Sequence, residues 1–223
     1  MTLDLFGPDD EPAGPACEPL ADGAWLLRGF ARAEAEVEAL LAGIAAVAAQ
    51  APWRHMATPG GRAMSVANTN CGALGWVSDA RGYRYQPTDP ASPDGSRPWP
   101  ALPAAFGALA GAAAAEAGYP GFVPDACLMN RYQPGTRLSL HQDRDERDFG
   151  APIVSVSLGL PAVFLFGGLR RTDPAARIRL VHGDVVVWGG PARLRFHGVL
   201  PLADGEHPRL GRQRLNLTFR RAG

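Results

Sequence analysis

The segment Leu138-Ser139-Leu140-His141-Gln142-Asp143-Arg144-Asp145-Glu146 places an imidazole and a carboxylate two residues apart on a short extended stretch. Because successive side chains of a strand point to opposite faces, His141 and Asp143 share one face and can reach the same metal ion. If His197 came in from a distant strand, the set would become two histidines and one carboxylate. Two histidines and one carboxylate occupy one face of an octahedral iron and leave the other face open. An H-x-D pattern alone is common, so the rest of the chain has to support this hypothesis.

The chain around this segment predicts a fold that is mainly β. Its 223 residues contain 27 Gly and 21 Pro, which favour short strands joined by turns over a helical bundle. Strand-like segments separated by turn signals recur through residues 125–223, at 127–132, 153–160, 163–166, 177–182, 184–188, 194–199 and 212–220. We therefore expect an α+β chain whose catalytic core, residues 125–223, is a double-stranded β-helix, or jelly roll.

The first half of the chain predicts a strand, two helices and a loop-rich segment. The strand is expected at 24–30, and the helices at 33–50 and 103–117 have apolar spacing or composition suited to bracing one sheet. Residues 53–100 are irregular and aromatic, which predicts a lid of short hairpins around 64–67 and 83–85. Residues 1–19 are acidic and rich in Pro, so we expect a disordered tail there and a single domain over 20–223.

Composition excludes several classes of protein. Cys17, Cys71 and Cys127 lie far apart without a C-x-x-C pair, which argues against a disulfide framework or a zinc site. No secretion signal or apolar run of membrane-spanning length is found, so we expect a soluble cytoplasmic protein with no membrane contact. The net charge is zero, but residues 1–129 carry 7 Arg and 14 acids, whereas residues 130–223 carry 15 Arg and 8 acids. The second half could therefore present a cationic face to phosphates.

The strongest local pattern is Arg214-Leu215-Asn216-Leu217-Thr218-Phe219-Arg220, in which polar and apolar residues alternate. In a strand the polar residues share one face and the apolar residues the other. One interpretation is a strand with a solvent-exposed outer face. The other is a receptor for a small dicarboxylate, because arginine binds carboxylates through two parallel hydrogen bonds. Alternation alone favours neither.

His141-x-Asp143, His197 and the R-x-N-x-T-x-R strand at 214–220 together resemble the iron(II)/2-oxoglutarate dioxygenases of the AlkB type, oxidative demethylases that repair alkylated nucleic acid bases. The resemblance runs from about residue 20 to the end of the chain and includes Met64-Ser65-Val66, Asn70-Cys71-Gly72, Gly75-Trp76, 124–127, 151–161 and 183–190.

The resemblance implies that His141, Asp143 and His197 hold iron(II), with 2-oxoglutarate and O2 as co-substrates. The residues implied for 2-oxoglutarate are Asn130, Tyr132, Arg214, Asn216, Thr218 and Arg220. Of the two arginines, we favour Arg214 for the far carboxylate of 2-oxoglutarate and Arg220 for its metal end. The sequence by itself leaves that assignment open.

The resemblance also implies a nucleobase pocket lined by Trp76 and Tyr83, although burial under a loop is the commoner fate of such aromatics. Asp145 would accept a hydrogen bond from the exocyclic amine of the base, and Arg144 and Arg171 would meet phosphate or the base edge. The implied substrates are 1-methyladenine and 3-methylcytosine in single-stranded or base-flipped DNA and RNA. The products would be formaldehyde, succinate and CO2, and we expect the enzyme to be a monomer.

Two alternatives remain open at this point. The same oxygenase chemistry could act on a small molecule or a protein side chain, or the jelly roll could be a non-catalytic binding module. The salt dependence of substrate binding distinguishes a nucleic-acid substrate from a small molecule or a protein, because binding to nucleic acid weakens steeply as salt rises. Turnover of 2-oxoglutarate distinguishes an enzyme from a non-catalytic binding module.

Overall fold

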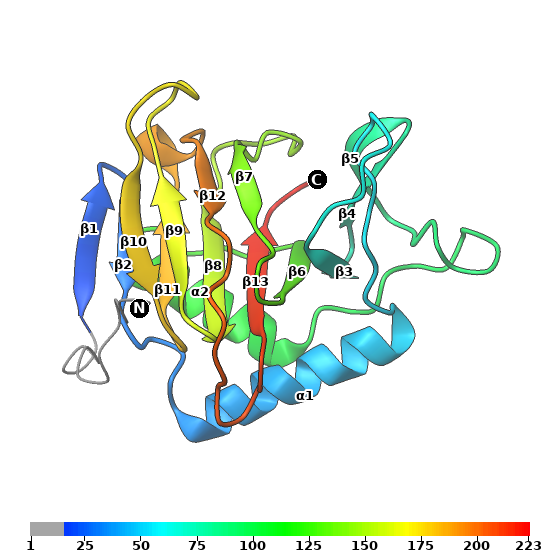
Figure 1. The fold of residues 1–223 in the computed structure, drawn as a ribbon, viewed down its shortest axis with the longest axis horizontal. Helices are drawn as coiled ribbons and strands as arrows, with labels where there is room; N and C mark the ends of the chain where they lie inside the picture. The colour runs from blue at the N-terminus through cyan, green and yellow to red at the C-terminus, as the bar shows by residue number, and fades with distance from the viewer. Residues whose placement is uncertain (1–15) are drawn as a thin grey trace, which may run out of the picture.

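The computed structural model describes residues 16–223, which form two antiparallel sheets and a separate hairpin (Figure 1). The larger sheet has the order β1 (Cys17–Ala21), β2 (Ala24–Leu27), β11 (Val185–Trp188), β8 (Ile153–Gly159), β13 (Arg214–Arg220), β6 (Ala126–Tyr132) and β3 (Ala67–Gly72). The smaller sheet has the order β10 (Ala176–Leu180), β9 (Ala162–Phe166), β12 (His197–Val199) and β7 (Leu138–His141). The hairpin pairs β4 (Gly75–Asp79) with β5 (Gly82–Gln86).

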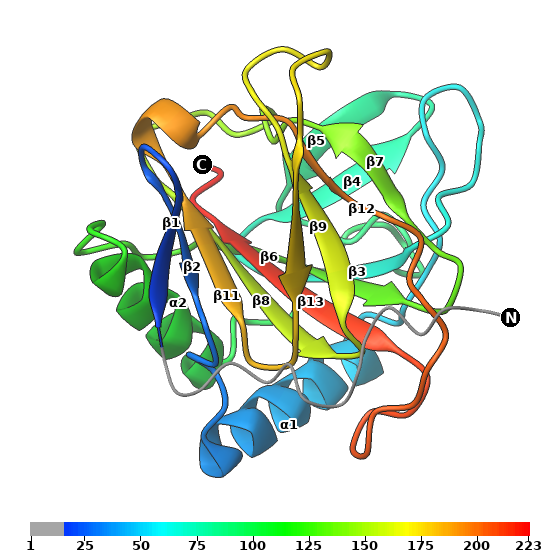
Figure 2. The ribbon, with the colours of Figure 1, turned by 60° about the vertical axis from the view of Figure 1, so that its left-hand side comes forward.

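The two sheets face one another in Figure 2, where the strands of the smaller sheet cross in front of the larger one. Leu26, Tyr132, Phe164 and Trp188 belong to a shared buried apolar cluster that joins the two sheets. This is the predicted jelly roll, and its antiparallel pairing runs through every strand contact of the described chain.

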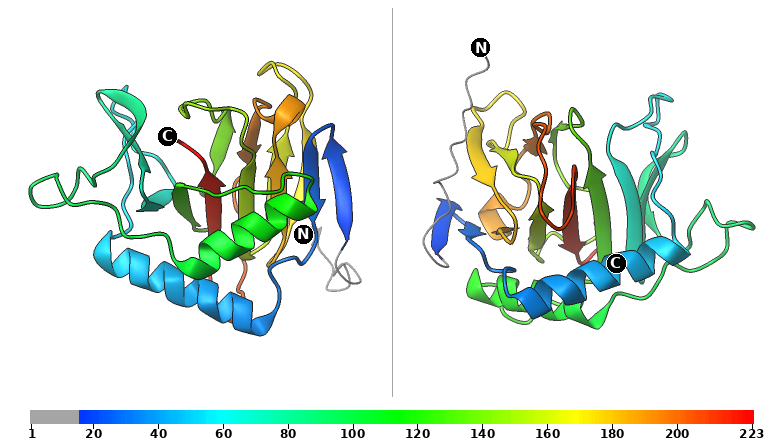
Figure 3. Two further views of the ribbon diagram at one scale, coloured as in Figure 1. Left: turned by 180° about the vertical axis from the view of Figure 1, so that it is seen from behind. Right: turned by 60° about the horizontal axis from the view of Figure 1, so that its bottom comes forward.

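Both helices cover the outer face of the larger sheet, as Figure 3 shows from behind and from below. Helix α1 spans Glu34–Gln50, and helix α2 spans Ala104–Glu116. Pro103 precedes α2 and Gly118, at φ 87°, follows it, which is the expected placement of these residues at helix ends. Phe106 of α2 packs edge-on against Phe219 of β13, with ring centroids 5.9 Å apart. The prediction that both helices brace one sheet is confirmed.

Strand β13 has no solvent-exposed face. Its apolar residues Leu215, Leu217 and Phe219 point toward the helices, where they join the outer apolar core. Its polar residues point between the two sheets and are also buried, with Arg214 only 1% exposed and Arg220 only 6% exposed. Charged groups are rarely buried unless something balances them. The interpretation of a solvent-exposed outer face is therefore wrong, and the polar side of β13 lines an internal site.

Two predicted boundaries are wrong. The tail expected over residues 1–19 falls mostly on residues outside the described part, but Cys17–Ala21 is strand β1, paired with β2. The lid expected over 53–100 includes β3, a fully buried edge strand of the larger sheet. Its sequence lacks apolar alternation because its buried polar side chains, such as Asn68 and Asn70, are hydrogen-bonded. The predicted hairpin around 83–85 is confirmed as β4–β5, while 63–68 pairs loosely with 54–57 and continues into β3.

Other predicted strands are shorter than expected. The strand predicted at 24–30 ends at Leu27, before Gly29 turns the chain at φ 59°. The strand predicted at 194–199 begins only at His197, because the chain first makes a 3-10 turn, η1, at Gly190–Ala192. Within residues 16–223 no helix is long and apolar enough to cross a membrane.

Candidate metal centre and substrate site

The three predicted metal ligands converge between the sheets. His141 ends β7 and His197 begins β12, and the antiparallel register makes them direct partners across the two strands. Asp143 follows β7 by two residues. Its Oδ1 lies 3.6 Å from Nε2 of His141, and its Oδ2 lies 3.8 Å from Nε2 of His197. The potential ligand atoms all lie within 4.8 Å of one another, a separation that a single ion can bridge.

Each imidazole is oriented by a backbone carbonyl. Nδ1 of His141 lies 2.9 Å from the carbonyl oxygen of Ser139, and Nδ1 of His197 lies 3.1 Å from that of Arg195. Because a carbonyl only accepts, each Nδ1 carries the hydrogen and each Nε2 offers its lone pair to the ion. Burial and the neighbouring His141 lower the pKa of His197 to about 4. His197 is therefore neutral at pH 7, as a metal ligand must be.

A close backbone contact sets the separation of the two histidine strands. Gly198, next to His197, lies against β7, and a Cβ at this position would lie 2.7 Å from the carbonyl oxygen of Leu138. It would also lie 3.1 Å from the backbone nitrogen of Leu140. Only glycine allows β12 to approach β7 this closely without a shift of the backbone.

Arg220 holds the third ligand. Its Nε and Nη2 donate to Oδ2 of Asp143 at 2.9 and 2.5 Å, and both side chains are less than 10% exposed. Burial alone would raise the pKa of Asp143, but Arg220 and the two histidines together keep it well below its usual range. Asp143 is therefore an anionic ligand, and its orientation is fixed before a metal binds.

Sequence reasoning missed a buried carboxylate behind this pair, Glu146, whose side chain is 2% exposed. Its Oε1 accepts from Tyr85 of β5 at 2.9 Å and lies 3.2 Å from Nε of Arg220, while its Oε2 lies 3.1 Å from Nη2 of Arg193. Arg193 also donates to the backbone carbonyl of Asp143 at 2.7 Å. Glu146 thus links the β4–β5 hairpin to the metal ligand. No signal distinguished it in the sequence, because it sits within a run of charged residues.

The residues predicted for 2-oxoglutarate lie on the inner face of the larger sheet. Asn130 and Tyr132 come from β6, and Arg214, Asn216, Thr218 and Arg220 come from the adjacent β13. Arg214 stacks over the ring of Tyr132 at 5.0 Å and donates from Nη2 to Ser157 at 2.9 Å. Ser157, on the neighbouring strand β8, is a contact that sequence reasoning missed.

Arg214 is a buried cation with unused donors. Its Nε and Nη1 are buried and find no hydrogen-bond partner among residues 16–223. Burial lowers the pKa of Arg214, although arginine remains charged at neutral pH. A guanidinium buried without a carboxylate is costly, so an anionic ligand is needed to complete this site. The donor set therefore fits the far carboxylate of 2-oxoglutarate.

The predicted base contacts also come together. Trp76 and Tyr83 of the hairpin stack with ring centroids 5.6 Å apart and planes inclined by 11°. Nε1 of Trp76 donates to Oδ2 of Asp145 at 2.7 Å, which joins this platform to the segment that carries the metal ligands. Tyr83 is 47% exposed, as expected for a surface on which a ligand could stack. Arg144 and Arg171 are exposed, and their predicted contacts with phosphate stay predictions.

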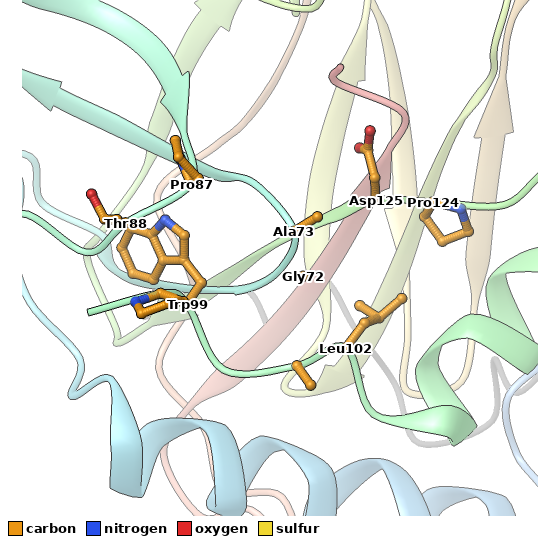
Figure 4. Close-up of a pocket in the computed structure, with 10 residues that line it drawn as sticks. Gly72, Ala73, Pro87, Thr88, Trp99, Leu102, Pro124 and Asp125 are labelled. Atoms are coloured by element: carbon orange, nitrogen blue, oxygen red, sulfur yellow. The ribbon is translucent and has the colours of Figure 1, made fainter. Parts of the chain in front are cut away.

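A separate hollow of about 580 Å³ lies near the start of β6 (Figure 4). It is lined mainly by proline, alanine and the indole of Trp99, together with Asp125. The carboxylate of Asp125 accepts from the backbone N–H groups of Ala222 and Gly223, so it anchors the end of the chain. None of the predicted site residues lines this cavity, and among residues 16–223 Asp125 is the one ionisable residue in its lining.

Comparison with known proteins points to the same chemistry as the metal centre. The model of the 2OG-Fe(II) oxygenase superfamily matches residues 23–220. The chain is 59% identical to a Salmonella typhimurium protein named alpha-ketoglutarate-dependent dioxygenase AlkB, over 99% of this chain and 98% of that protein. It is 36% identical to mouse nucleic acid dioxygenase ALKBH1, over 60% of this chain and 34% of that protein. The solved structure of OsALKBH1 matches with a TM-score of 0.77 and 30% identity, covering 92% of this chain and 100% of that one.

Proposed function

The chain belongs to the 2OG-Fe(II) oxygenase superfamily, and from this premise we propose that it oxidatively demethylates alkylated bases in nucleic acid. The observation that carries the proposal is the convergence of His141, Asp143 and His197 beside a buried arginine that lacks an anionic partner. An oxygenase acting through iron and a dicarboxylate needs both features. The bacterial and mouse relatives carry names that fit this activity.

In this proposal, Nε2 of each histidine and the Asp143 carboxylate would hold iron(II). Arg214 would hold the far carboxylate of 2-oxoglutarate through its unpaired donors, while Arg220 is already engaged by Asp143 and Glu146. Asn130, Tyr132, Asn216 and Thr218 line the space between the two ends. Iron with 2-oxoglutarate and O2 supplies the oxidation of an N-methyl group, which leaves as formaldehyde while 2-oxoglutarate becomes succinate and CO2.

The chain itself positions the base. Trp76 and Tyr83 offer aromatic faces on which an unstacked base can lie, and such stacking contributes about 1–3 kcal/mol per base. Asp145 offers a carboxylate to the exocyclic amine of a base made cationic by methylation. A methyl group on the pairing edge is accessible only when the base is single-stranded or flipped. The proposed substrates are therefore 1-methyladenine and 3-methylcytosine in single-stranded or base-flipped DNA and RNA.

The test is formaldehyde release from methylated oligonucleotides in the presence of iron(II), ascorbate and 2-oxoglutarate. We expect stoichiometric formaldehyde and succinate from single-stranded substrates, with activity that falls steeply as salt rises. Turnover of 2-oxoglutarate without any formaldehyde would contradict nucleic acid as the substrate. A total lack of 2-oxoglutarate turnover would contradict the oxygenase itself.

The predicted assembly and location complete the proposal. We expect a cytoplasmic monomer, whose metal ligands and dicarboxylate residues lie together in a single chain. Sedimentation of the protein with and without an oligonucleotide tests the monomer, and fractionation of cells tests the location.

A further inference from the structure

Three asparagines form a row across the inner face of the larger sheet. Asn68 of β3, Asn130 of β6 and Asn216 of β13 are direct partners across neighbouring strands. Nδ2 of Asn68 donates to Oδ1 of Asn130 at 2.6 Å, and Nδ2 of Asn130 donates to Oδ1 of Asn216 at 3.1 Å. All three are buried, between 4% and 5% exposed.

A single backbone carbonyl fixes the direction of the whole row. Nδ2 of Asn216 donates to the carbonyl oxygen of Val156 at 3.0 Å, and because a carbonyl only accepts, Asn216 cannot be flipped. Its Oδ1 therefore faces Asn130, which must present its amide nitrogen. Oδ1 of Asn130 then faces Asn68, which must also present its amide nitrogen. The hydroxyl of Thr218 donates to the same Oδ1 of Asn216 at 3.0 Å, which agrees with this direction.

The row ends in an acceptor without a donor. Oδ1 of Asn68 is buried and has no hydrogen-bond partner among residues 16–223. A buried acceptor left unpaired is costly, so a ligand that binds here is favoured if it brings an N–H or O–H group. At neutral pH, 2-oxoglutarate has two carboxylates and a ketone, all of which only accept. The co-substrate cannot satisfy this atom.

Asn68 lies on the strand that is hydrogen-bonded to the aromatic platform. Asn70 is the next residue of β3 on the same face, about 7 Å along the strand. Its side chain makes two hydrogen bonds with the backbone of Trp76, at 2.9 Å and 3.0 Å, and so ties the platform to the inner face of β3. A base stacked on this platform would lie beside the strand that carries Asn68.

We propose that Asn68 is a specificity-determining residue, whose Oδ1 accepts one hydrogen of the exocyclic amine of the flipped base, while Asp145 accepts the other. This inference rests on the proposed function. In 3-methylcytosine an amine lies beside the methylated ring nitrogen, whereas 3-methylthymine has a carbonyl oxygen at that place. The amine completes the asparagine row, but the carbonyl would set one acceptor against another. The row therefore selects bases that carry an amine.

The two pyrimidines provide a matched test. Asn68→Leu is close in size to the native residue and removes the acceptor, whereas Asn68→Gln keeps both the donor and the acceptor of an amide. For each protein, kcat/KM is measured on the same single-stranded oligonucleotide carrying either 3-methylcytosine or 3-methylthymine. The affinity of the iron-free protein for both oligonucleotides is measured by fluorescence anisotropy, which does not depend on activity.

We expect Asn68→Leu to lower kcat/KM and affinity for 3-methylcytosine about tenfold, the effect of losing one hydrogen bond to a charged group. Loss of the hydrogen bond from Asn68 to Asn130 affects both substrates alike, so the values for 3-methylthymine should fall less than those for 3-methylcytosine. Asn68→Gln should keep the preference for 3-methylcytosine. An equal loss on both bases, or an unchanged ratio between them, would overturn the inference. Failure of the proposed function would look different, because the native enzyme would then release formaldehyde from neither base.

Discussion

Arg220 donates two hydrogen bonds to one oxygen of Asp143, from Nε at 2.9 Å and from Nη2 at 2.5 Å. This ion pair separates the tasks of the two arginines of β13. Arg220 neutralises a metal ligand, so Arg214 is the one with donors available for a carboxylate from outside the protein. Of the two assignments that the sequence left open, the geometry favours Arg214 for the far end of 2-oxoglutarate.

Replacing Arg220 by alanine would leave the buried carboxylates of Asp143 and Glu146 without their shared cation. Breaking a buried ion pair in this way costs about 3–5 kcal/mol. We expect a loss of that order in the free energy of unfolding of the metal-free protein, measured with urea. Manganese(II) should recover part of it, because the ion supplies positive charge to Asp143. Arg220→Lys is the matched control, and an equal loss in both variants would mean that charge is not the cause.

Arg214→Ala should raise the half-saturation concentration of 2-oxoglutarate by about 10- to 100-fold. The reason is the loss of a charge-assisted pair with the far carboxylate, which contributes roughly 1.5–3 kcal/mol. Succinate formation at varied 2-oxoglutarate measures the effect, and manganese(II) affinity without the co-substrate should stay unchanged. A larger effect on the metal than on 2-oxoglutarate would speak against this assignment.

His141→Ala should abolish iron binding and activity while the fold persists. His141 is partly exposed at the end of a strand and contributes little to the apolar core, so its loss removes a ligand without opening a large cavity. Loss of a residue that only hydrogen-bonds to a metal ligand typically lowers activity 10- to 100-fold, so we expect a larger loss when the ligand itself is removed. Manganese(II) or cobalt(II) titration and thermal unfolding, run side by side, separate loss of the ion from loss of the fold.

Trp76→Ala should weaken binding of a methylated oligonucleotide by about 1–3 kcal/mol, the contribution of one base–aromatic stack. Turnover of 2-oxoglutarate in the absence of substrate should not change, because the ring of Trp76 stacks on Tyr83 and donates to Asp145, neither of which is a metal ligand. Tyr83→Phe, which keeps the ring, serves as the control. A native affinity for the oligonucleotide in Trp76→Ala would remove Trp76 from the base pocket.

His182 gives a prediction for the pH dependence of stability. Burial, then the stacked His207 and nearby arginines, lower its pKa to about 4. The unfolded chain, with a pKa near 6.5, binds a proton more readily than the folded protein between pH 6.5 and 4. The contribution of His182 to the free energy of unfolding is therefore fully present above about pH 6.5 and is lost as the pH drops toward 4.

The full shift would correspond to roughly 3 kcal/mol, and solvent screening of this half-buried ring should reduce the measured change to about 1–2 kcal/mol. Nδ1 of His182 accepts from the backbone of Gly159 at 3.0 Å, so His182→Asn keeps an acceptor but cannot titrate. Urea unfolding at several pH values should show a shallower acid slope in this variant than in the native protein. Equal slopes would mean that other groups control the loss.

The sequence predicted much of this site because its signals are local. The alternation over 214–220 places side chains on one face of β13. The H-x-D spacing starts at His141, the last residue of β7, and brings Asp143 to the same site from two residues beyond the strand. The pairing of His197 with His141 depends instead on the register between strands far apart in the chain. Spacing cannot predict such a contact, and only the resemblance to a family brought His197 into the set.

Residues whose polarity concealed their burial were harder to predict. Strand β3 is fully buried, yet its Asn and Thr side chains suggested a loop, because their hydrogen-bond partners lie on other strands. Glu146 appeared as one acid among several, although Arg193 and Arg220 surround it in the fold. A polar residue inside a protein is identified by the groups that satisfy it, and those groups are absent from its own stretch of sequence.

The absence of a side chain at Gly198 affects the distance between the two histidine ligands. This residue touches no ion and takes part in no reaction, yet it determines the gap across which two imidazoles must meet. One added methyl group would force the backbones of β12 and β7 to shift apart and would displace His197 relative to His141. The spacing of the two histidine ligands thus depends on the absence of a side chain at this position.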